Sequence, residues 1–280
     1  MRRARPFAVD HDGLCVAGLD WGGAGTPLLF LHPNGFCAGL FDPVARRLTD
    51  RFRAVGVDIR GHGASDKPPP PEPYRYELMA ADVAAVLDAL GLDDVAVVGG
   101  SLGGGVAIHL DRLQPGRLRR MMLCEAIARP RPPGPPPENP LVATALRRRV
   151  IWRSRAEMIA SYGSRPPLDR LAPEALEAYV AWGTTLREDG TVELACPPEV
   201  EAAIFGSAPM REGVAEAWDH LAHLSAPAVV LAGANSGLDA AWFRDQAERA
   251  GADFALIDGG HFFLHEDTDR AIDLVTRHLG

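Results

Sequence analysis

Short runs of consecutive apolar residues, rather than strictly alternating ones, dominate the pattern of this chain. They occur at Pro27–Leu31, Arg53–Asp58, Val95–Val98, Leu118–Cys124, Pro227–Ala232 and Asp253–Ile257. Such runs are typical of strands buried on both faces of a parallel sheet. Helical spacing of apolar residues lies between them, most clearly over Leu78–Leu90, Ala240–Ala250 and Asp267–Leu279. Strands that alternate with helices predict an α/β fold, in which helices cover both faces of a mostly parallel sheet.

The alternation stops after Leu118–Cys124. Ala128–Pro140 is packed with prolines and suits neither a helix nor a central strand. Leu141–Tyr162, Pro173–Thr185 and about 199–224 are then expected to be helical. We therefore expect a core of residues 1–125 and 225–280, with residues 126–224 inserted as a helical lid. Such an insertion would lie over the carboxyl ends of the strands, where sheets of this kind bind ligands.

One glycine-rich turn carries the clearest chemical signal. The apolar run Val95–Val98 leads into Gly99-Gly100-Ser101-Leu102-Gly103, which fits G-x-S-x-G, and apolar residues at helical spacing follow. A strand, a tight turn and a helix form the context of a nucleophile elbow. Its glycines would remove side chains that collide with neighbouring backbone. A phosphate-binding loop is not favoured, because no lysine follows the glycines. Ser101 is therefore the predicted nucleophile.

Composition and net charge argue against several kinds of partner and site. The chain has 280 residues and a formal net charge of −8, which argues against nucleic acid or an anionic membrane as a partner. Its four cysteines form no C-x-x-C pair, which argues against a zinc site or a disulfide framework. No apolar run has the length of a signal peptide or a membrane span. We expect a cytoplasmic enzyme that acts on a small molecule.

Four motifs occur in an order that resembles the α/β-hydrolases with a helical cap. They are His32-Pro33-Asn34-Gly35, Asp58–Asp66, the elbow at Ser101, and Gly259-Gly260-His261-Phe262. The resemblance covers nearly the whole chain and implies a substrate site between core and cap. It implies cleavage of an ester or lactone without a cofactor or a metal. A serine at the elbow disfavours dehalogenase or epoxide hydrolase chemistry, which uses an aspartate nucleophile.

The resemblance also assigns roles to particular residues. A serine hydroxyl needs a positioned base, and the family places that base at His261. The family uses the loops of His32 and His62 for structure and for the oxyanion site, so these two are expected to brace loops. The oxyanion hole would combine the backbone N–H of Leu102 with one from the loop after Leu31. Pro33 has no N–H, so Asn34 is expected to donate, with Phe36 as the fallback.

The third member of the triad has two candidates. Most relatives carry the acid a few residues after the strand that corresponds to Pro227–Ala232, but the expected position near Ser236 has no carboxylate. Asp239 lies three residues beyond that position and suits the N-cap of the next helix. Glu125 ends the strand after the elbow helix, an arrangement that resembles haloalkane dehalogenases and mycoestrogen-lactone hydrolases. The sequence favours Glu125 and keeps Asp239 as the alternative.

The expected activity is hydrolysis of an ester or lactone of a bulky apolar small molecule. The same fold also hosts carbon–carbon bond hydrolases, lyases, haloperoxidase-like enzymes and non-catalytic ligand-binding proteins. The insertion is rich in aromatic side chains, including Trp152, Trp182 and Trp218. Most of these are expected to pack within the insertion rather than line a pocket. The sequence leaves the natural substrate and the oligomeric state open.

Overall fold

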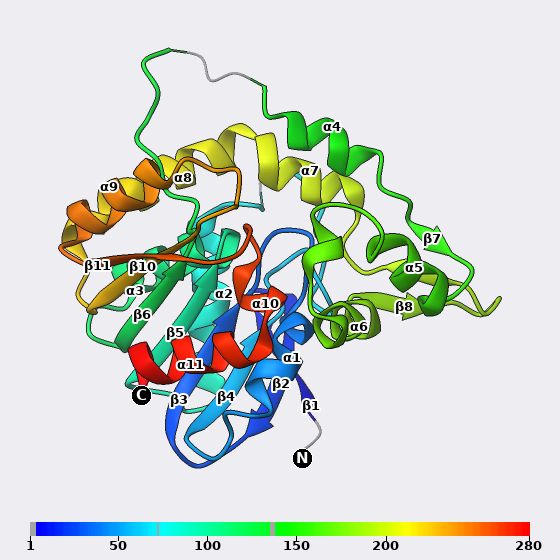
Figure 1. Cartoon of the computed structure of the whole chain (residues 1–280), viewed down its shortest axis with the longest axis horizontal. Coiled ribbons are helices and arrows are strands. Elements are labelled where there is room, and N and C mark those ends of the chain that lie inside the picture. Colours follow the sequence, from blue (N-terminus) through cyan, green and yellow to red (C-terminus); the bar gives the residue numbers. More distant parts are fainter. Residues whose placement is uncertain (1–3, 72, 135–137) are drawn as a thin grey trace.

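The computed structural model describes residues 4–71, 73–134 and 138–280. Within them an eight-stranded sheet has the order β1-β2-β4-β3-β5-β6-β10-β11 (Figure 1). β1 and β2 and also β2 and β4 pair antiparallel, and the remaining neighbours pair parallel. The strands are β1 (Arg5–His11), β2 (Leu14–Gly22), β3 (Thr26–Leu31), β4 (Phe52–Val57), β5 (Val95–Gly100), β6 (Leu118–Cys124), β10 (Ala228–Gly233) and β11 (Asp253–Ile257). The predicted mostly parallel sheet is confirmed.

Helices cover both faces of this sheet, which explains the uninterrupted apolar runs. In β3, Leu29 and Leu31 face one apolar cluster, whereas Leu28 and Phe30 face the other. Because side chains alternate along a strand, a strand buried on both faces must be apolar throughout. The first cluster contains α2 (Tyr76–Ala89), α3 (Leu102–Leu113) and α9 (Ala240–Ala250); the second contains the 3-10 helix η1 (Ala38–Phe41), α1 (Asp42–Ala45), α10 (Phe263–Glu266) and α11 (Thr268–Leu279).

The segment between β6 and β10 is not wholly helical, contrary to expectation. It contains α4 (Pro140–Leu146), β7 (Ile151–Trp152), α5 (Arg155–Tyr162), η2 (Leu168–Arg170), α6 (Pro173–Trp182), β8 (Thr184–Leu186), β9 (Val192–Leu194), α7 (Pro198–Gly206), α8 (Ala208–His220) and η3 (Leu221–His223). Three of these form an antiparallel sheet in the order β7-β9-β8. The turn between β8 and β9 contains Asp189 and Gly190, and Gly190 has φ +81°. Asp-Gly is a hairpin signal, and this turn lies between the expected helices Pro173–Thr185 and 199–224 rather than within one of them.

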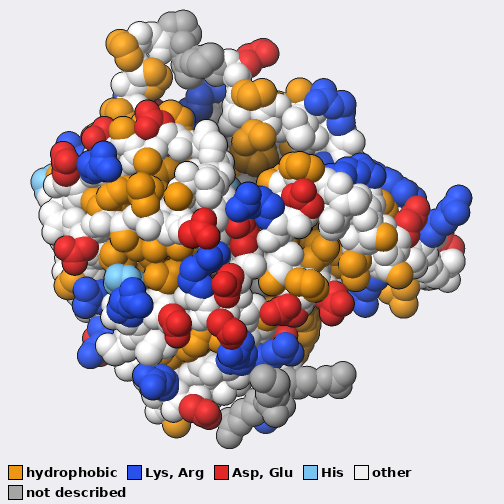
Figure 2. Space-filling model, viewed as in Figure 1, with side chains coloured by type: hydrophobic (Ala, Val, Ile, Leu, Met, Phe, Trp, Pro, Cys, Tyr) orange, Lys and Arg blue, Asp and Glu red, His pale blue; other side chains and the backbone are white. Residues whose placement is uncertain are grey.

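The inserted segment has an apolar cluster that contains Trp152, Met158, Leu176 and Tyr179 and also includes Phe36 of the core. Trp152 is buried as expected, whereas Trp182 is 37% exposed. Figure 1 shows this segment running along one end of the sheet and down beside α1. Acidic and basic side chains are interspersed over the face shown in Figure 2.

Two predicted loops are described only in part. Glu72 of the proline-rich turn and residues 135–137 of the linker Ala128–Pro140 lie outside the described residues. All four cysteines are free, and three of them are buried. Across the described parts of the chain, no helix combines the length and the apolar character needed to cross a bilayer.

Candidate active site

Ser101 occupies the sharp turn between β5 and α3. Its backbone has φ 52° and ψ −112°, a combination that a residue with a side chain adopts only under strain. Two backbone hydrogen bonds hold the turn against the chain at the end of β6. The Ser101 N–H donates to the Cys124 carbonyl at 2.9 Å, and the Ser101 carbonyl accepts from the Ile127 N–H at 3.1 Å. This is the strand, turn and helix that the G-x-S-x-G pattern predicts.

The glycines of the turn allow close backbone contacts. A Cβ on Gly103 would lie 2.1 Å from the Leu31 carbonyl oxygen, and one on Gly104 would lie 2.4 Å from the Ala126 Cβ. A Cβ on Gly99 would lie 2.7 Å from the Gly104 Cα. The first turn of α3 therefore packs closely against β3 and against the residues that follow β6. The expectation that these positions exclude side chains is confirmed.

Glu125 and His261 meet at the same sheet edge. Glu125 follows β6, has φ 48° and is completely buried. Its Oε2 lies 2.5 Å from His261 Nδ1, and its Oε1 accepts the Gly233 N–H at 2.7 Å. Both carboxylate oxygens thus have partners, which a buried charge requires. The contact to Nδ1 favours the tautomer that carries its proton there, and Nε2 is then left as an acceptor.

Ser101 and His261 are less closely linked. Among the described residues, no hydrogen bond joins the Ser101 hydroxyl to the His261 ring, whose side chain is 22% exposed. Ser101 itself is partly exposed. Hydrogen bonds between nucleophile and base are often long without substrate and tighten when substrate binds. The arrangement therefore leaves both side chains open to a ligand.

Asp239, the alternative acid, has a different environment. It is the N-cap of α9, and its carboxylate accepts the Ala241 N–H at 2.9 Å. Across the described residues, it makes no hydrogen bond to His261. Of the two candidate acids, Glu125 is thus the one in contact with the histidine.

Two residues of the loop after β3, Asn34 and Phe36, are the candidate oxyanion donors, and their N–H groups differ in hydrogen bonding among the described residues. The Gly35 N–H donates to His62 Nε2 at 3.0 Å, and the Phe36 N–H donates to the Pro33 carbonyl at 3.3 Å. The N–H groups of Asn34 and Leu102 have no hydrogen-bond partner within the described part of the chain. The Asn34 side-chain amide donates to the Glu201 carbonyl at 3.0 Å and so anchors the loop. The geometry favours Asn34 over Phe36 as an oxyanion donor.

His32 and His62 brace this loop, as expected. His32 Nε2 accepts the Ile59 N–H at 3.0 Å, and His62 Nε2 accepts that of Gly35. Burial lowers the pKa of His32 to about 4 and places the pKa of His62 well below its ordinary value. Both rings are therefore neutral at pH 7 and can serve as acceptors.

Acid is expected to destabilise the fold through these two rings. In the unfolded chain they titrate near pH 6.5, but in the fold only at lower pH. Between these values the unfolded chain binds more protons, so the free energy of unfolding falls as pH drops from about 6.5 towards 4. Urea unfolding followed by tryptophan fluorescence at several pH values measures this loss. Replacement of the exposed His223 by Gln serves as the control, because it removes a histidine from the surface rather than from this loop. A midpoint that stays constant down to pH 4 would contradict the prediction.

The inserted segment also holds the loop after β3, which the sequence did not reveal. Arg148 pairs with Glu201 and donates to the hydroxyls of Tyr162 and Tyr179 at 2.9 and 2.8 Å. The Tyr179 hydroxyl in turn donates to the Gly35 carbonyl at 3.0 Å. No local pattern in the sequence relates residues so far apart, and only the tertiary structure brings them together.

Aromatic rings connect the two loops of the site. The Phe36 ring lies 4.6 Å from Tyr179 and 5.0 Å from Phe262, centroid to centroid. Phe262 follows His261 directly, and their rings are 4.9 Å apart. Within the described residues, no group of three or more His, Cys, Asp or Glu side chains is arranged to hold a metal ion.

Curated relatives match part of the chain. The putative carbamate hydrolase RutD of Caulobacter segnis is 36% identical over 122 residues, which cover 43% of this chain and 46% of that protein. The non-heme chloroperoxidase of Streptomyces lividans is 36% identical over 119 residues, covering 41% of this chain and 42% of that protein. The chain thus spans less than half the length of these relatives.

Solved structures match over nearly the full length. E-2-(acetamidomethylene)succinate hydrolase superposes with a TM-score of 0.79 at 20% identity and 99% coverage of both chains. An N-acyl homoserine lactone degrading enzyme superposes with a TM-score of 0.71 at 25% identity, covering 98% of this chain and 100% of that one. The family model for the alpha/beta hydrolase fold matches residues 26–268. With the strand order and the strained serine turn, these findings show that the chain belongs to the α/β-hydrolase family.

Proposed function

We propose that this chain is a serine hydrolase that cleaves an ester or lactone of a bulky apolar small molecule through an acyl-enzyme. One observation carries the proposal. A fully buried carboxylate, that of Glu125, lies 2.5 Å from His261 Nδ1 at the sheet edge where the elbow presents Ser101. A nucleophile beside a base that is itself oriented by an acid is the general arrangement for acyl transfer.

The first half of the reaction forms the acyl-enzyme. The Ser101 hydroxyl attacks the substrate carbonyl carbon and passes its proton to His261 Nε2. Glu125 stabilises the imidazolium that results and keeps its ring oriented. The N–H groups of Leu102 and Asn34 donate to the developing oxyanion, which is where such groups contribute most to rate. His261 then protonates the leaving alkoxide, and the carbon–oxygen bond breaks.

The second half releases the acid. His261 removes a proton from water, which attacks the acyl carbonyl while the same two N–H groups hold the oxyanion. Collapse of this intermediate returns the proton from His261 to Ser101 and frees the carboxylic acid. Every step uses only groups of this chain and water.

The surroundings of the loops support an apolar substrate. Phe36 and Phe262 adjoin the oxyanion loop and His261, and both belong to the apolar cluster of the inserted segment. We assign residues 126–224 to a cap over the site, with a core of residues 1–125 and 225–280. The 25% identical structural neighbour is described as degrading N-acyl homoserine lactones, and an enol-lactonase from Burkholderia xenovorans LB400 has the same fold at 21% identity. Both names are consistent with a lactone substrate.

Carbamate cleavage is a second candidate. The 36% identical segment shared with a putative carbamate hydrolase favours it. A carbamate carbonyl would be attacked by Ser101 in the same way, and His261 would protonate the leaving group. The two candidates differ in the acyl group that the serine carries.

Covalent labelling combined with a substrate panel tests the proposal. A fluorophosphonate probe should label the wild type and leave Ser101→Ala unlabelled, because the probe reacts with an activated serine. Nitrophenyl esters, γ- and δ-lactones and an aryl carbamate should separate the candidates, with hydrophobic esters or lactones turned over fastest. Ser101→Ala should lower kcat by about 10⁶ on the best substrate, as loss of a triad serine does elsewhere. A wild type that labels no better than Ser101→Ala would disprove the hydrolase assignment.

A further inference from the structure

The loop that carries His261 is held by a carboxylate that has no part in the reaction above. Glu266 lies at the end of α10, and its Oε1 and Oε2 accept the Gly260 N–H at 2.9 and 3.1 Å. Its side chain is only 8% exposed. The Gly260 N–H belongs to the peptide between Gly259 and Gly260, so these bonds hold the backbone one residue before His261.

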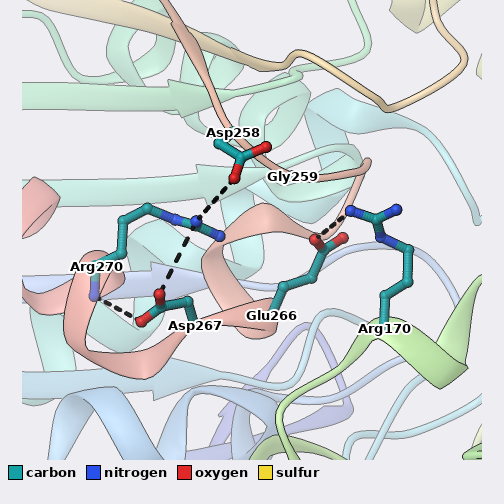
Figure 3. A pocket seen from close by; sticks show the side chains of 6 residues that line it. All are labelled: Arg170, Asp258, Gly259, Glu266, Asp267 and Arg270. Carbon is teal, nitrogen blue, oxygen red and sulfur yellow. Dashed lines mark hydrogen bonds and ion pairs between the residues drawn. The ribbon is translucent and has the colours of Figure 1, made fainter.

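A residue of the inserted segment holds that carboxylate in turn. Arg170 of η2 donates to Glu266 Oε2 at 3.1 Å, and both side chains line the same pocket (Figure 3). Neighbouring bonds join the same two segments. The Ala172 N–H donates to the His265 carbonyl at 2.8 Å, and the Thr268 hydroxyl donates to Glu174 at 2.9 Å. The contact of Arg170 with Glu266 is thus one of several hydrogen bonds that join the inserted segment to the core at this place.

The carbonyl groups of Gly259 and Gly260 face the end of β10. A Cβ on Gly233 would lie 2.2 Å from the Gly260 carbonyl oxygen, and the Gly233 N–H is the one that donates to Glu125. The Asn235 N–H also donates to the Gly259 carbonyl, at 2.8 Å. The loop that carries His261 therefore packs between the end of β10 on one side and Glu266 on the other. Loss of the Glu266 contact would free it on one side only.

We propose that Glu266 is a positioning residue for His261, and that Arg170 keeps its carboxylate aimed at the Gly260 N–H. The inference rests on the proposed hydrolase function. A base must be held within a fraction of an ångström of its productive position, and supporting hydrogen bonds provide that precision. Glu266 does not touch the reacting atoms, so its removal should lower kcat and leave KM little changed.

Four variants test this on the best ester or lactone substrate. Glu266→Leu removes both acceptors and should lower kcat on the order of 10²-fold, the cost of a base displaced by about 1 Å. Glu266→Gln keeps one acceptor oxygen and should restore most of that loss. Arg170→Gln should give a smaller loss in the same direction. Asp258→Asn is the matched control, because Asp258 lines the same pocket but is 87% exposed and makes no bond to Gly260 or His261 within the described residues.

Hydrogen exchange of the segment around Gly260 and His261 gives a second readout, independent of turnover. Exchange should be faster in Glu266→Leu than in the wild type, and close to wild type in Glu266→Gln. Wild-type kcat in Glu266→Leu would overturn the inference, as would a change confined to KM or an equal loss in Glu266→Gln. If Glu266→Leu does not fold, Arg170→Gln decides by whether kcat falls. A wild type that neither labels nor turns over substrate refutes the proposed function itself, a result distinct from all of these.

Discussion

Replacing Glu125 by Gln is expected to lower kcat on the order of 10⁴-fold, whereas Asp239→Asn should leave turnover close to wild type. Glutamine has the shape of glutamate and can still accept the Gly233 N–H. It cannot carry the negative charge that stabilises an imidazolium, and its NH₂ group favours the wrong tautomer of His261. The loss should therefore appear mainly in kcat. Steady-state kinetics on the best ester or lactone measures it.

Asp239→Asn is the matched control because asparagine caps a helix about as well as aspartate. It therefore preserves α9 while removing the carboxylate that the sequence keeps as the alternative acid. Circular dichroism and thermal unfolding of both variants check that the fold is intact. If the large loss follows Asp239→Asn and Glu125→Gln remains active, the assignment of Glu125 is wrong.

Gly103→Ala is expected to prevent folding or to lower the free energy of unfolding by more than about 4 kcal/mol. The added Cβ would lie 2.1 Å from the Leu31 carbonyl oxygen and 2.7 Å from the Leu31 Cβ. Neither atom can yield easily, because β3 is a central strand that pairs with both β4 and β5. The elbow helix would have to move away from the sheet. Soluble yield and urea unfolding measure the effect.

Gly100→Ala provides the comparison at the same end of β5. A Cβ there would meet Pro33 side-chain atoms at 3.6 and 3.7 Å, which is ordinary van der Waals contact. Its stability should stay close to that of the wild type, although it adjoins Ser101. Equal stability of the two alanine variants would show that the close approach of α3 to β3 is not what demands a glycine at Gly103.

The sequence by itself determined the parts of this protein that depend on local pattern. Apolar runs identified the strands of the parallel sheet, and β6, α9 and β11 have the predicted bounds. They did so because strands covered on both faces must be apolar at every position. The turn at Ser101 could be predicted from the sequence for a similar reason, because backbone strain and close packing favour glycine at the neighbouring positions. Where the pattern is weaker, in the inserted segment, β7 and the start of β8 lie where the sequence predicts helix, whereas β9 lies between two predicted helices.

Only the tertiary structure decided which distant side chains meet. Glu125 and Asp239 both follow strands that end at the same sheet edge, so the sequence alone could favour one without excluding the other. The backbone of Glu125 at φ 48° and the Gly233 N–H aim its carboxylate at His261, while Asp239 is engaged at the start of α9. The bonds of Arg170 to Glu266 and of Tyr179 to Gly35 have the same origin. Contacts between remote segments leave no periodic trace in a sequence, because they depend on how complete elements pack.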